Sequence, residues 1–233
     1  MRRYRAPYRY ISFYQFKPLT KHRRKEILFI CKFILYEKEG KIVTSKPQNA
    51  VYIVDDPEKI RLLADFTRTE ILRILNKSPL TETQLSEQLS LTKAAVGYHL
   101  HLLLNAGLIC IEKVESEKHG ILQKYYRPIA ALFIVDPNKI PRDVQRHYIQ
   151  IQIDHLIGML SALQLNHKVP EISTKSLEEL ARAMLKELMV IGQKYVGQTT
   201  TENGETLKIK IYAEAMKNLV RNARALSTSK KVK

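Results

Sequence analysis

A chain of 233 residues with a formal net charge of +16 has room for one large or two ordinary domains and favours an anionic partner. Its two cysteines, Cys31 and Cys110, show no metal-ligand spacing, which argues against a disulfide framework and a structural zinc site and favours a reducing, cytoplasmic setting. No nucleophile elbow or phosphate-binding glycine loop occurs among the eight glycines, so we expect no enzymatic activity.

The positive charge is concentrated at the two ends of the sequence. Residues 1–25 contain nine Lys/Arg and no Asp/Glu, and residues 217–233 contain six Lys/Arg and no acidic residue. The other 191 residues carry 24 basic and 23 acidic groups, a net charge of +1. Long-range attraction of an anionic partner is therefore expected to come mainly from the termini.

Residues 1–50 form a basic, aromatic extension with two open interpretations. The interleaved "RRYRAPYRY" suits an arm that follows phosphates or enters a minor groove. Alternatively, translation starts further on and this segment is upstream or disordered, because the module that follows needs nothing before about residue 50. The start lacks a signal peptide's apolar core. The run at 27–36 is interrupted by Lys32 and spans half of the ~20 residues a membrane helix needs, so we expect a buried helix or strand and no membrane partner.

Helix-start signals then follow one another closely. "DDPEKIRLLAD" places Asp56 as an N-cap before a proline at the first helical position. "TRTEILRIL" suggests a capping box made by Thr67 and Glu70, and "TETQLSEQL" suggests another made by Thr81 and Gln84. Between them, "KSPL" is a short connector or strand. Three helices are predicted in this order.

A fourth helix is predicted only about three residues further on, over residues 92–106. Thr92 can cap it, the apolar side chains recur at spacings of three and four, and Gly107 supplies a left-handed stop. A tight helix, turn, helix pair with an amphipathic second member is the arrangement that lets one helix lie in a DNA major groove. The apolar positions are Val96, Leu100, Leu103 and Leu104.

The His-x-His pair in this helix is not predicted to bind a metal. Side chains at i and i+2 point about 200° apart on a helix, so His99 and His101 diverge. His99 is expected to be partly buried and hydrogen-bonded within the domain or to a phosphate. His101 falls on the non-core face, which is open to a partner and comprises Ala94, Gly97, Tyr98, His101 and Asn105.

Two segments rich in β-formers follow the helix. "LICIEKVE" and "ILQKYYRP" are joined by "SEKHG", which predicts a two-stranded wing.

The frame "KIRLLADFTRTEILRIL", "LTETQLSEQLSLTKAAVGYHLHLLLNAGLI" and "KYYRP" resembles the winged helix-turn-helix module of ArsR-type transcriptional regulators. The resemblance covers residues 55–128, about a third of the chain, and implies a DNA-binding domain over residues 51–135. The expected fold is mainly α with a small β wing, followed by a C-terminal helical bundle. Carried over position by position, the implied DNA contacts are Thr92, Lys93, Ala94, Gly97, Tyr98 and His101, with Lys118 and His119 at the wing tip.

This sequence departs from the family pattern at several positions, so not every property of the family is expected here. Metal-sensing members carry a Cys-x-Cys pair before the recognition helix, and "TQLSEQL" contains none. Their C-terminal ligand set is not reproduced by Asp154, His155 and His167, so we expect no metal cofactor. Tyr98 stands where a long polar residue is common. Gly97 either permits close approach of the backbone to DNA or reflects ordinary sequence drift.

Residues 136–233 are predicted to form helices with a basic tail. Their apolar seams alternate spacings of three and four, which is typical of helices that pack against each other. The helix at about 142–165 is either part of an intramolecular bundle or a dimer interface, and both can hold. The candidate dimerisation residues are Ile149, Ile153, Leu156, Leu160 and Leu163; the other seams are Leu177, Ala181, Met184, Leu188, Ile191 and Tyr195, and Tyr212, Met216, Leu219, Ala223 and Leu226.

The expected function is sequence-specific binding of double-stranded DNA by a homodimeric transcriptional regulator acting on an inverted repeat. Two alternatives remain open. Residues 54–135 contain ten basic and ten acidic groups, and a neutral winged helix also suits a protein–protein or RNA-binding module. The helical region could instead hold a small apolar effector, although its Met and Leu stripes are more often plain core.

Overall fold

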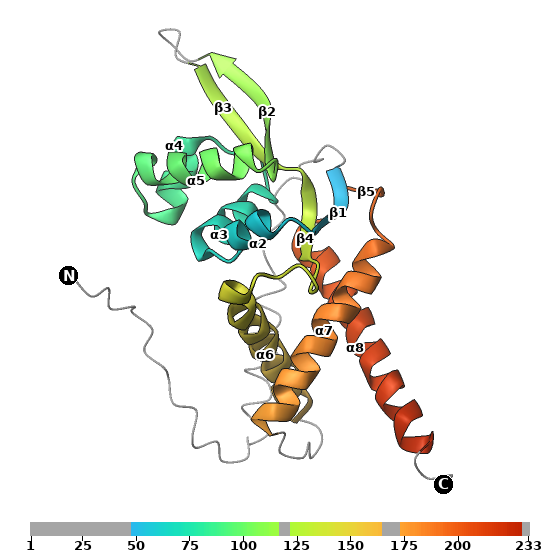
Figure 1. Cartoon of the computed structure of the whole chain (residues 1–233). Helices are drawn as coiled ribbons and strands as arrows, with labels where there is room; N and C mark the ends of the chain where they lie inside the picture. The colour runs from blue at the N-terminus through green and yellow to red at the C-terminus, as the bar shows by residue number, and fades with distance from the viewer. Residues whose placement is uncertain (1–47, 117–121, 165–172, 230–233) are drawn as a thin grey trace, which may run out of the picture. The chain divides into compact units, whose positions relative to one another are not determined.

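The computed structural model describes residues 48–116, 122–164 and 173–229, and Figure 1 shows their arrangement. None of the helices in these three segments is long and apolar enough to cross a membrane. The elements follow in the order β1 Gln48–Val54, α2 Pro57–Leu63, α3 Phe66–Leu75, α4 Glu82–Leu89, α5 Lys93–Asn105, β2 Ile109–Ser116, β3 Leu122–Pro128, β4 Ala130–Val135, α6 Arg142–Gln164, α7 Thr174–Gln193, β5 Thr199–Thr200 and α8 Gly204–Ser229.

The helix starts agree with the sequence signals in three of four cases. Asp56 caps α2, Thr92 caps α5, and Thr81 closes a reciprocal capping box at α4. The box predicted at Thr67 is wrong. The N-cap of α3 is Asp65, whose carboxylate accepts a hydrogen bond from the Arg68 amide at 3.0 Å, so Thr67 already lies inside the helix.

The helices α2 to α5 and the hairpin β2–β3 enclose one hydrophobic core. Ser90 takes a left-handed conformation at the end of α4, and α5 begins three residues later, which makes the predicted tight turn. The predicted fold is confirmed: a winged helix-turn-helix with a small β wing, followed by a C-terminal helical region. The buried residues of this core include Ile60, Ile71, Leu75, Leu85, Val96, Leu100, Leu103 and Leu108.

A second sheet was not predicted. β1 pairs in parallel with β4, with Val51 opposite Leu132, and β5 adds antiparallel pairing at the other edge of β1. β1 contains Val, Tyr and Ile, and β4 is a continuous apolar run, as suits strands covered by other elements. The winged module therefore occupies the connection between two hydrogen-bonded parallel strands.

The C-terminal helices cover this second sheet. α7 packs on β1 and β4, and α8 packs on β4. Gly204, at the start of α8, lies so close to the strand that a Cβ atom there would be 2.3 Å from the Ala131 carbonyl oxygen. The contact thus requires glycine. The shared core comprises Ala50, Val51, Ala131, Ile134, Met184, Leu188, Ile191, Leu207, Ile211 and Ala215.

The helix predicted as a dimer interface, α6, packs largely against another helix of the same chain. Ile149 and Leu156 are buried in a cluster with Ala181 and Leu185 of α7. These two seam residues are therefore unavailable to a second chain, which corrects that part of the prediction. The reason is that α7 has the same apolar spacing as α6, so the apolar side chains of the two helices pack against each other.

Beside the buried residues Ile149 and Leu156, α6 has a stripe of apolar side chains that reaches the surface. Ile153 and Leu160 are partly buried and Ile157 is 46% exposed. The side chain of Leu163 lies outside the described residues. The stripe has the spacing of four and three that a helix–helix contact uses.

α6 also joins the C-terminal helices to the winged module. The buried hydroxyl of Tyr148 donates a hydrogen bond to the Ile60 carbonyl of α2 at 2.7 Å, and burial raises the pKa of Tyr148. On the surface, Arg61 pairs with Asp143 at 2.9 Å. The exposed ion pair adds little free energy, so the buried hydrogen bond is the firmer connection.

The close contact of α8 with the sheet gives a stability prediction. Gly204→Ala should lower the free energy of unfolding by about 1–3 kcal/mol, because the new methyl group meets a backbone oxygen that cannot rotate away. Gly158→Ala in α6 is the matched control, since a Cβ there meets nothing within 4 Å and should gain up to about 1 kcal/mol of helix propensity. Urea unfolding followed by circular dichroism measures both. Equal effects of the two substitutions would contradict the packing described.

Candidate nucleic-acid interface

α5 presents one buried and one exposed face. Val96, Leu100 and Leu103 lie in the core. On the opposite side, the predicted outer stripe is confirmed as surface: Tyr98 is 61% exposed, and Ala94, His101 and Asn105 are exposed as well. These four side chains are therefore accessible to a partner.

The N-terminal end of α5 carries the only basic side chain of that helix. Thr92 accepts a hydrogen bond from the Ala95 amide at 3.2 Å, and Lys93 beside it is exposed. The positive end of a helix dipole attracts phosphate oxygens, and Lys93 adds a full charge at the same place. This end is thus suited to a phosphate contact.

Gly97 faces the neighbouring helix α4. A Cβ atom at this position would lie 3.1 Å from a carboxylate oxygen of Glu82, at the start of α4. The glycine in the middle of α5 therefore allows a close approach to α4, not to DNA. Gly97 does not face outward with the other residues of the stripe.

Glu82 is an acidic group near the candidate interface that the sequence analysis did not single out. The pKa of Tyr126 on β3 is raised, mainly by burial and further by the charge of Glu82. The carboxylate thus lies near both α5 and the wing. The negative charge of Glu82 repels a polyanion that approaches the region between α5 and the wing. Basic side chains at other positions must offset this repulsion. In the sequence, only the glycine at position 97 of the predicted helix indicated that another element packs closely against this point.

The two histidines of α5 diverge as helical geometry requires. His101 is exposed and its ring lies 3.3 Å from the amide nitrogen of Asn105. His99 is partly buried as predicted, but its Nδ1 atom is buried without a hydrogen-bond partner, so the expected bond within the domain is missing at that atom. In the segments that the structure describes, no three His, Cys, Asp or Glu side chains gather as a metal site would need.

The wing is formed by β2 and β3 as predicted, with a register shift between Ile111 and Lys113. Its tip, with Lys118 and His119, lies outside the described residues. Lys113 pairs with Glu115 at 2.5 Å and lies 4.2 Å from the centre of the Tyr125 ring. The ion pair raises the pKa of Lys113 and lowers that of Glu115.

One face of the wing carries two apolar side chains that are open to solvent. Val114 and Lys124 are cross-strand partners, and Leu122 follows next to them on that face. Val114 is 50% and Leu122 67% exposed. The wing therefore offers apolar contact as well as charge.

Comparisons with known proteins agree with the helix-turn-helix geometry. The family model described as "Bacterial regulatory protein, arsR family" matches residues 65–110, from the N-cap of α3 to the second residue of β2. No curated protein matches the chain.

Several solved structures resemble the chain weakly. Reduced HlyU from Vibrio cholerae N16961 is 20% identical and covers 44% of this chain and 83% of its own, with a TM-score of 0.25. The adhesin competence repressor AdcR from Streptococcus pyogenes is 15% identical, covering 75% and 97%, with a TM-score of 0.26. A variant of ZitR from Lactococcus lactis is 15% identical, covering 76% and 99%, with a TM-score of 0.25.

TM-scores this low support no residue-by-residue comparison, so the assignment depends on the family model and on the observed fold. The match contains α3, the helix-turn-helix pair α4 and α5, and the start of β2. Residues 65–110 are an ArsR-family helix-turn-helix domain, set within a winged helix-turn-helix fold.

Proposed function

We propose that this protein is a transcriptional regulator that binds double-stranded DNA in a sequence-specific way, with α5 in the major groove. The observation that carries the proposal is the exposed outer face of α5, placed as the second helix of an ArsR-family helix-turn-helix. In this arrangement the N-terminal residues of the second helix reach base edges. The residues proposed to contact DNA are Thr92, Lys93, Ala94, Tyr98 and His101, with Lys118 and His119 of the wing tip.

Within this set the roles differ by chemistry. Lys93 and the Thr92 end of the helix suit phosphates, and these contacts fix position. Tyr98 and His101 lie further along the helix and offer a hydroxyl, a ring nitrogen and aromatic surface to base edges. Sequence preference is therefore assigned to Tyr98 and His101.

The number of contacts favours two copies on the DNA. One recognition helix with a single lysine supplies fewer contacts than a specific site with tight binding usually needs. A homodimer doubles them and matches an inverted repeat with half-sites about 10 base pairs apart, or a multiple of that. We propose that the stripe of exposed Ile157 and partly buried Ile153 and Leu160 on α6 forms the dimer contact.

A protein-binding role for the winged module is the second candidate. It is favoured by the exposed apolar wing face of Val114 and Leu122 and by the equal numbers of basic and acidic groups in residues 54–135. Selection from a random pool of duplex DNA separates the two functions. Enrichment of a two-fold symmetric sequence supports the regulator, whereas no enrichment supports the protein-binding module.

Substitutions on α5 test the direct contacts. Lys93→Ala and Tyr98→Ala should each weaken binding to the selected DNA by about 1–3 kcal/mol, because each removes one contact from an exposed side chain. Lys186→Ala on the exposed side of α7 removes the same charge elsewhere and should leave affinity unchanged. The measurement is fluorescence anisotropy at fixed salt, with circular dichroism to verify folding. Wild-type affinity in a folded Lys93→Ala, Tyr98→Ala double variant would refute the assignment of α5.

A second pair of substitutions tests the dimer. The wild-type chain should have the mass of a dimer at micromolar concentration, and Ile157→Asp should yield folded monomers because it places a charge in the proposed contact. Ile209→Asp on α8 is the control, since Ile209 is 68% exposed and lies outside that contact. Light scattering with size exclusion gives the masses. A monomeric wild-type chain, or a dimer unaffected by Ile157→Asp, is the result that rules this contact out.

A further inference from the structure

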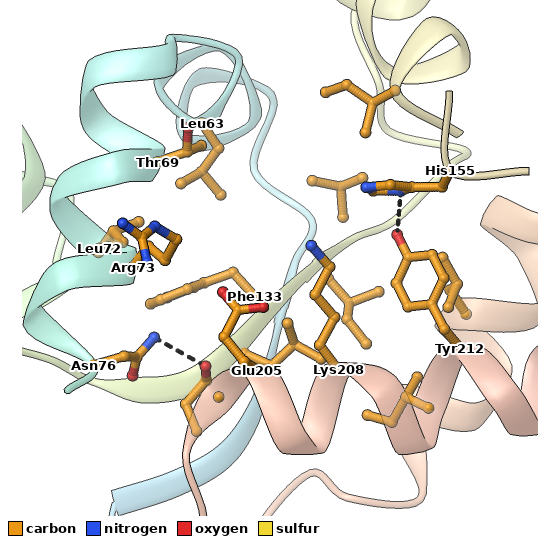
Figure 2. A pocket seen from close by; sticks show the side chains of 18 of the residues that line it. Leu63, Thr69, Leu72, Arg73, Asn76, Phe133, His155, Glu205, Lys208 and Tyr212 are labelled. Carbon is orange, nitrogen blue, oxygen red and sulfur yellow. Dashed lines mark hydrogen bonds between the residues drawn. The ribbon is translucent and has the colours of Figure 1, made fainter. Parts of the chain in front are cut away.

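A cavity of about 510 Å³ lies where the winged module meets the C-terminal helices. Figure 2 shows side chains from α3, β4, α6 and α8 surrounding it. Its size is in the range of about 300–1,000 Å³ that is usual for small-molecule sites. Of the described residues proposed to contact DNA, none lines it, so the cavity needs a separate explanation.

The walls are mostly apolar. Phe133 of β4 projects between α3 and α8, with Leu72 on the α3 side (Figure 2). Phe66, the first residue of α3, also lines the cavity and is 70% exposed, which is unusual for so large an apolar side chain. An apolar body placed in the cavity would remove these surfaces from water.

The described lining contains two basic and two acidic side chains, but they are not evenly paired. Arg73 of α3 is held by Glu70 through two hydrogen bonds of 2.8 and 2.5 Å, and the charge of Glu205 further raises the pKa of Arg73. Lys208 of α8 is directed into the cavity (Figure 2). No carboxylate of the described residues pairs with it, not even Glu205 one helical turn before, and its contact is the Tyr212 ring, 5.9 Å from the ammonium.

Beside Lys208, three polar side chains form a connected network. Gln152 of α6 is 5% exposed, and its amide nitrogen donates to the Tyr212 hydroxyl at 3.1 Å. That hydroxyl lies 3.2 Å from Nδ1 of His155. The hydroxyl also lies 3.2 Å from the Gln152 side-chain oxygen, and its one proton goes to either that oxygen or Nδ1. In the arrangement in which Gln152 donates to the hydroxyl and the hydroxyl donates to Nδ1, the imidazole carries its proton on Nε2, and this second nitrogen is directed toward the cavity in Figure 2.

The surroundings of His155 favour its neutral form. Burial lowers its pKa, the nearby positive charge of Lys208 lowers it further, and Asp154 opposes the shift only as the smallest of the three causes. A neutral imidazole with an N–H toward the cavity is a hydrogen-bond donor. Together with the ammonium of Lys208, it gives the cavity two donors next to an apolar wall.

We propose that this cavity binds a small monocarboxylate with an apolar body, its carboxylate held by Lys208 and the Nε2–H of His155 and its body against Phe133 and Phe66. The carboxylate is attracted by Lys208, the one cation of the described lining that lacks an ion pair, while the charge of Glu205, the second carboxylate of the lining, acts on Arg73. The apolar walls favour a hydrocarbon or aromatic body over a polar one.

The position of the cavity connects binding to regulation, and this step rests on the proposed function. α3 supplies one wall and belongs to the helix-turn-helix core, while α6 and α8 supply the other. A ligand that contacts both sides stabilises one arrangement of the module relative to the helices. Where that arrangement differs from the others in affinity for DNA, the ligand changes DNA affinity and DNA changes ligand affinity by the same factor.

Ligand binding is tested on the full chain without DNA, by isothermal titration calorimetry with octanoate and with 1-naphthaleneacetate. We expect one site per chain for at least one of them and weaker binding of neutral 1-octanol. Lys208→Met should weaken carboxylate binding about tenfold, as loss of a charge-assisted contact does, and leave 1-octanol unaffected. Lys210→Met is the matched control, because Lys210 pairs with Glu202 at 2.5 Å and does not line the cavity.

A fluorescent variant locates the site independently. The chain contains no tryptophan, so Phe66→Trp places a single fluorophore at the cavity. Octanoate should change its emission and should leave Val190→Trp, on the exposed side of α7, unchanged.

Three results would overturn the inference: no binding of either carboxylate, binding that is equal for Lys208→Met and Lys210→Met, or binding that changes only the emission of Val190→Trp. Carboxylate binding at this site in a chain that selects no DNA sequence would refute the proposed regulator function and leave the ligand site standing.

Discussion

The parallel pairing of β1 with β4 is the interaction on which the rest of the structure depends. It joins strands that lie on either side of the winged module in the sequence, and it brings both ends of the module to one point. The same two strands are the surface on which α7 packs, and α8 packs on β4. Without this pair, the module and the C-terminal helices would be joined mainly by the contacts of α6 with α2.

This arrangement separates two kinds of surface. The outer face of α5 remains open, because the core of the module is complete without it. The opposite side, toward α6 and α8, contains the cavity beside Phe133. A partner of α5 and a ligand of the cavity therefore contact different residues, and the helix-turn-helix core lies between them. That geometry is what a regulator needs if a small molecule is to alter its binding of DNA.

The sequence predicts the local features well and the long-range ones poorly. Caps at Asp56, Thr81 and Thr92 follow from neighbouring residues alone, and the wing follows from β-formers around a short turn. Pairing of β1 with β4 depends on residues far apart in the chain, and an apolar run such as "AALFIV" has no periodicity that distinguishes strand from helix. Likewise, the apolar spacing of α6 predicts that a partner covers it, but not that α7 covers one edge and leaves Ile157 exposed. The cavity has no sequence signal, since α2, α3, β4, α6, α7 and α8 all contribute residues to it.

The central claim is that the outer face of α5 lies against the duplex. Hydroxyl-radical footprinting of the full chain, with and without DNA selected by the protein, measures this directly through the oxidation rates of exposed side chains. Tyr98 and His101 on α5 should be protected by DNA, whereas His147, which is exposed on α6, should be oxidised at the same rate in both states. Protection of His147 with no change at Tyr98 and His101 would contradict the account, because it would place the duplex against the C-terminal helices.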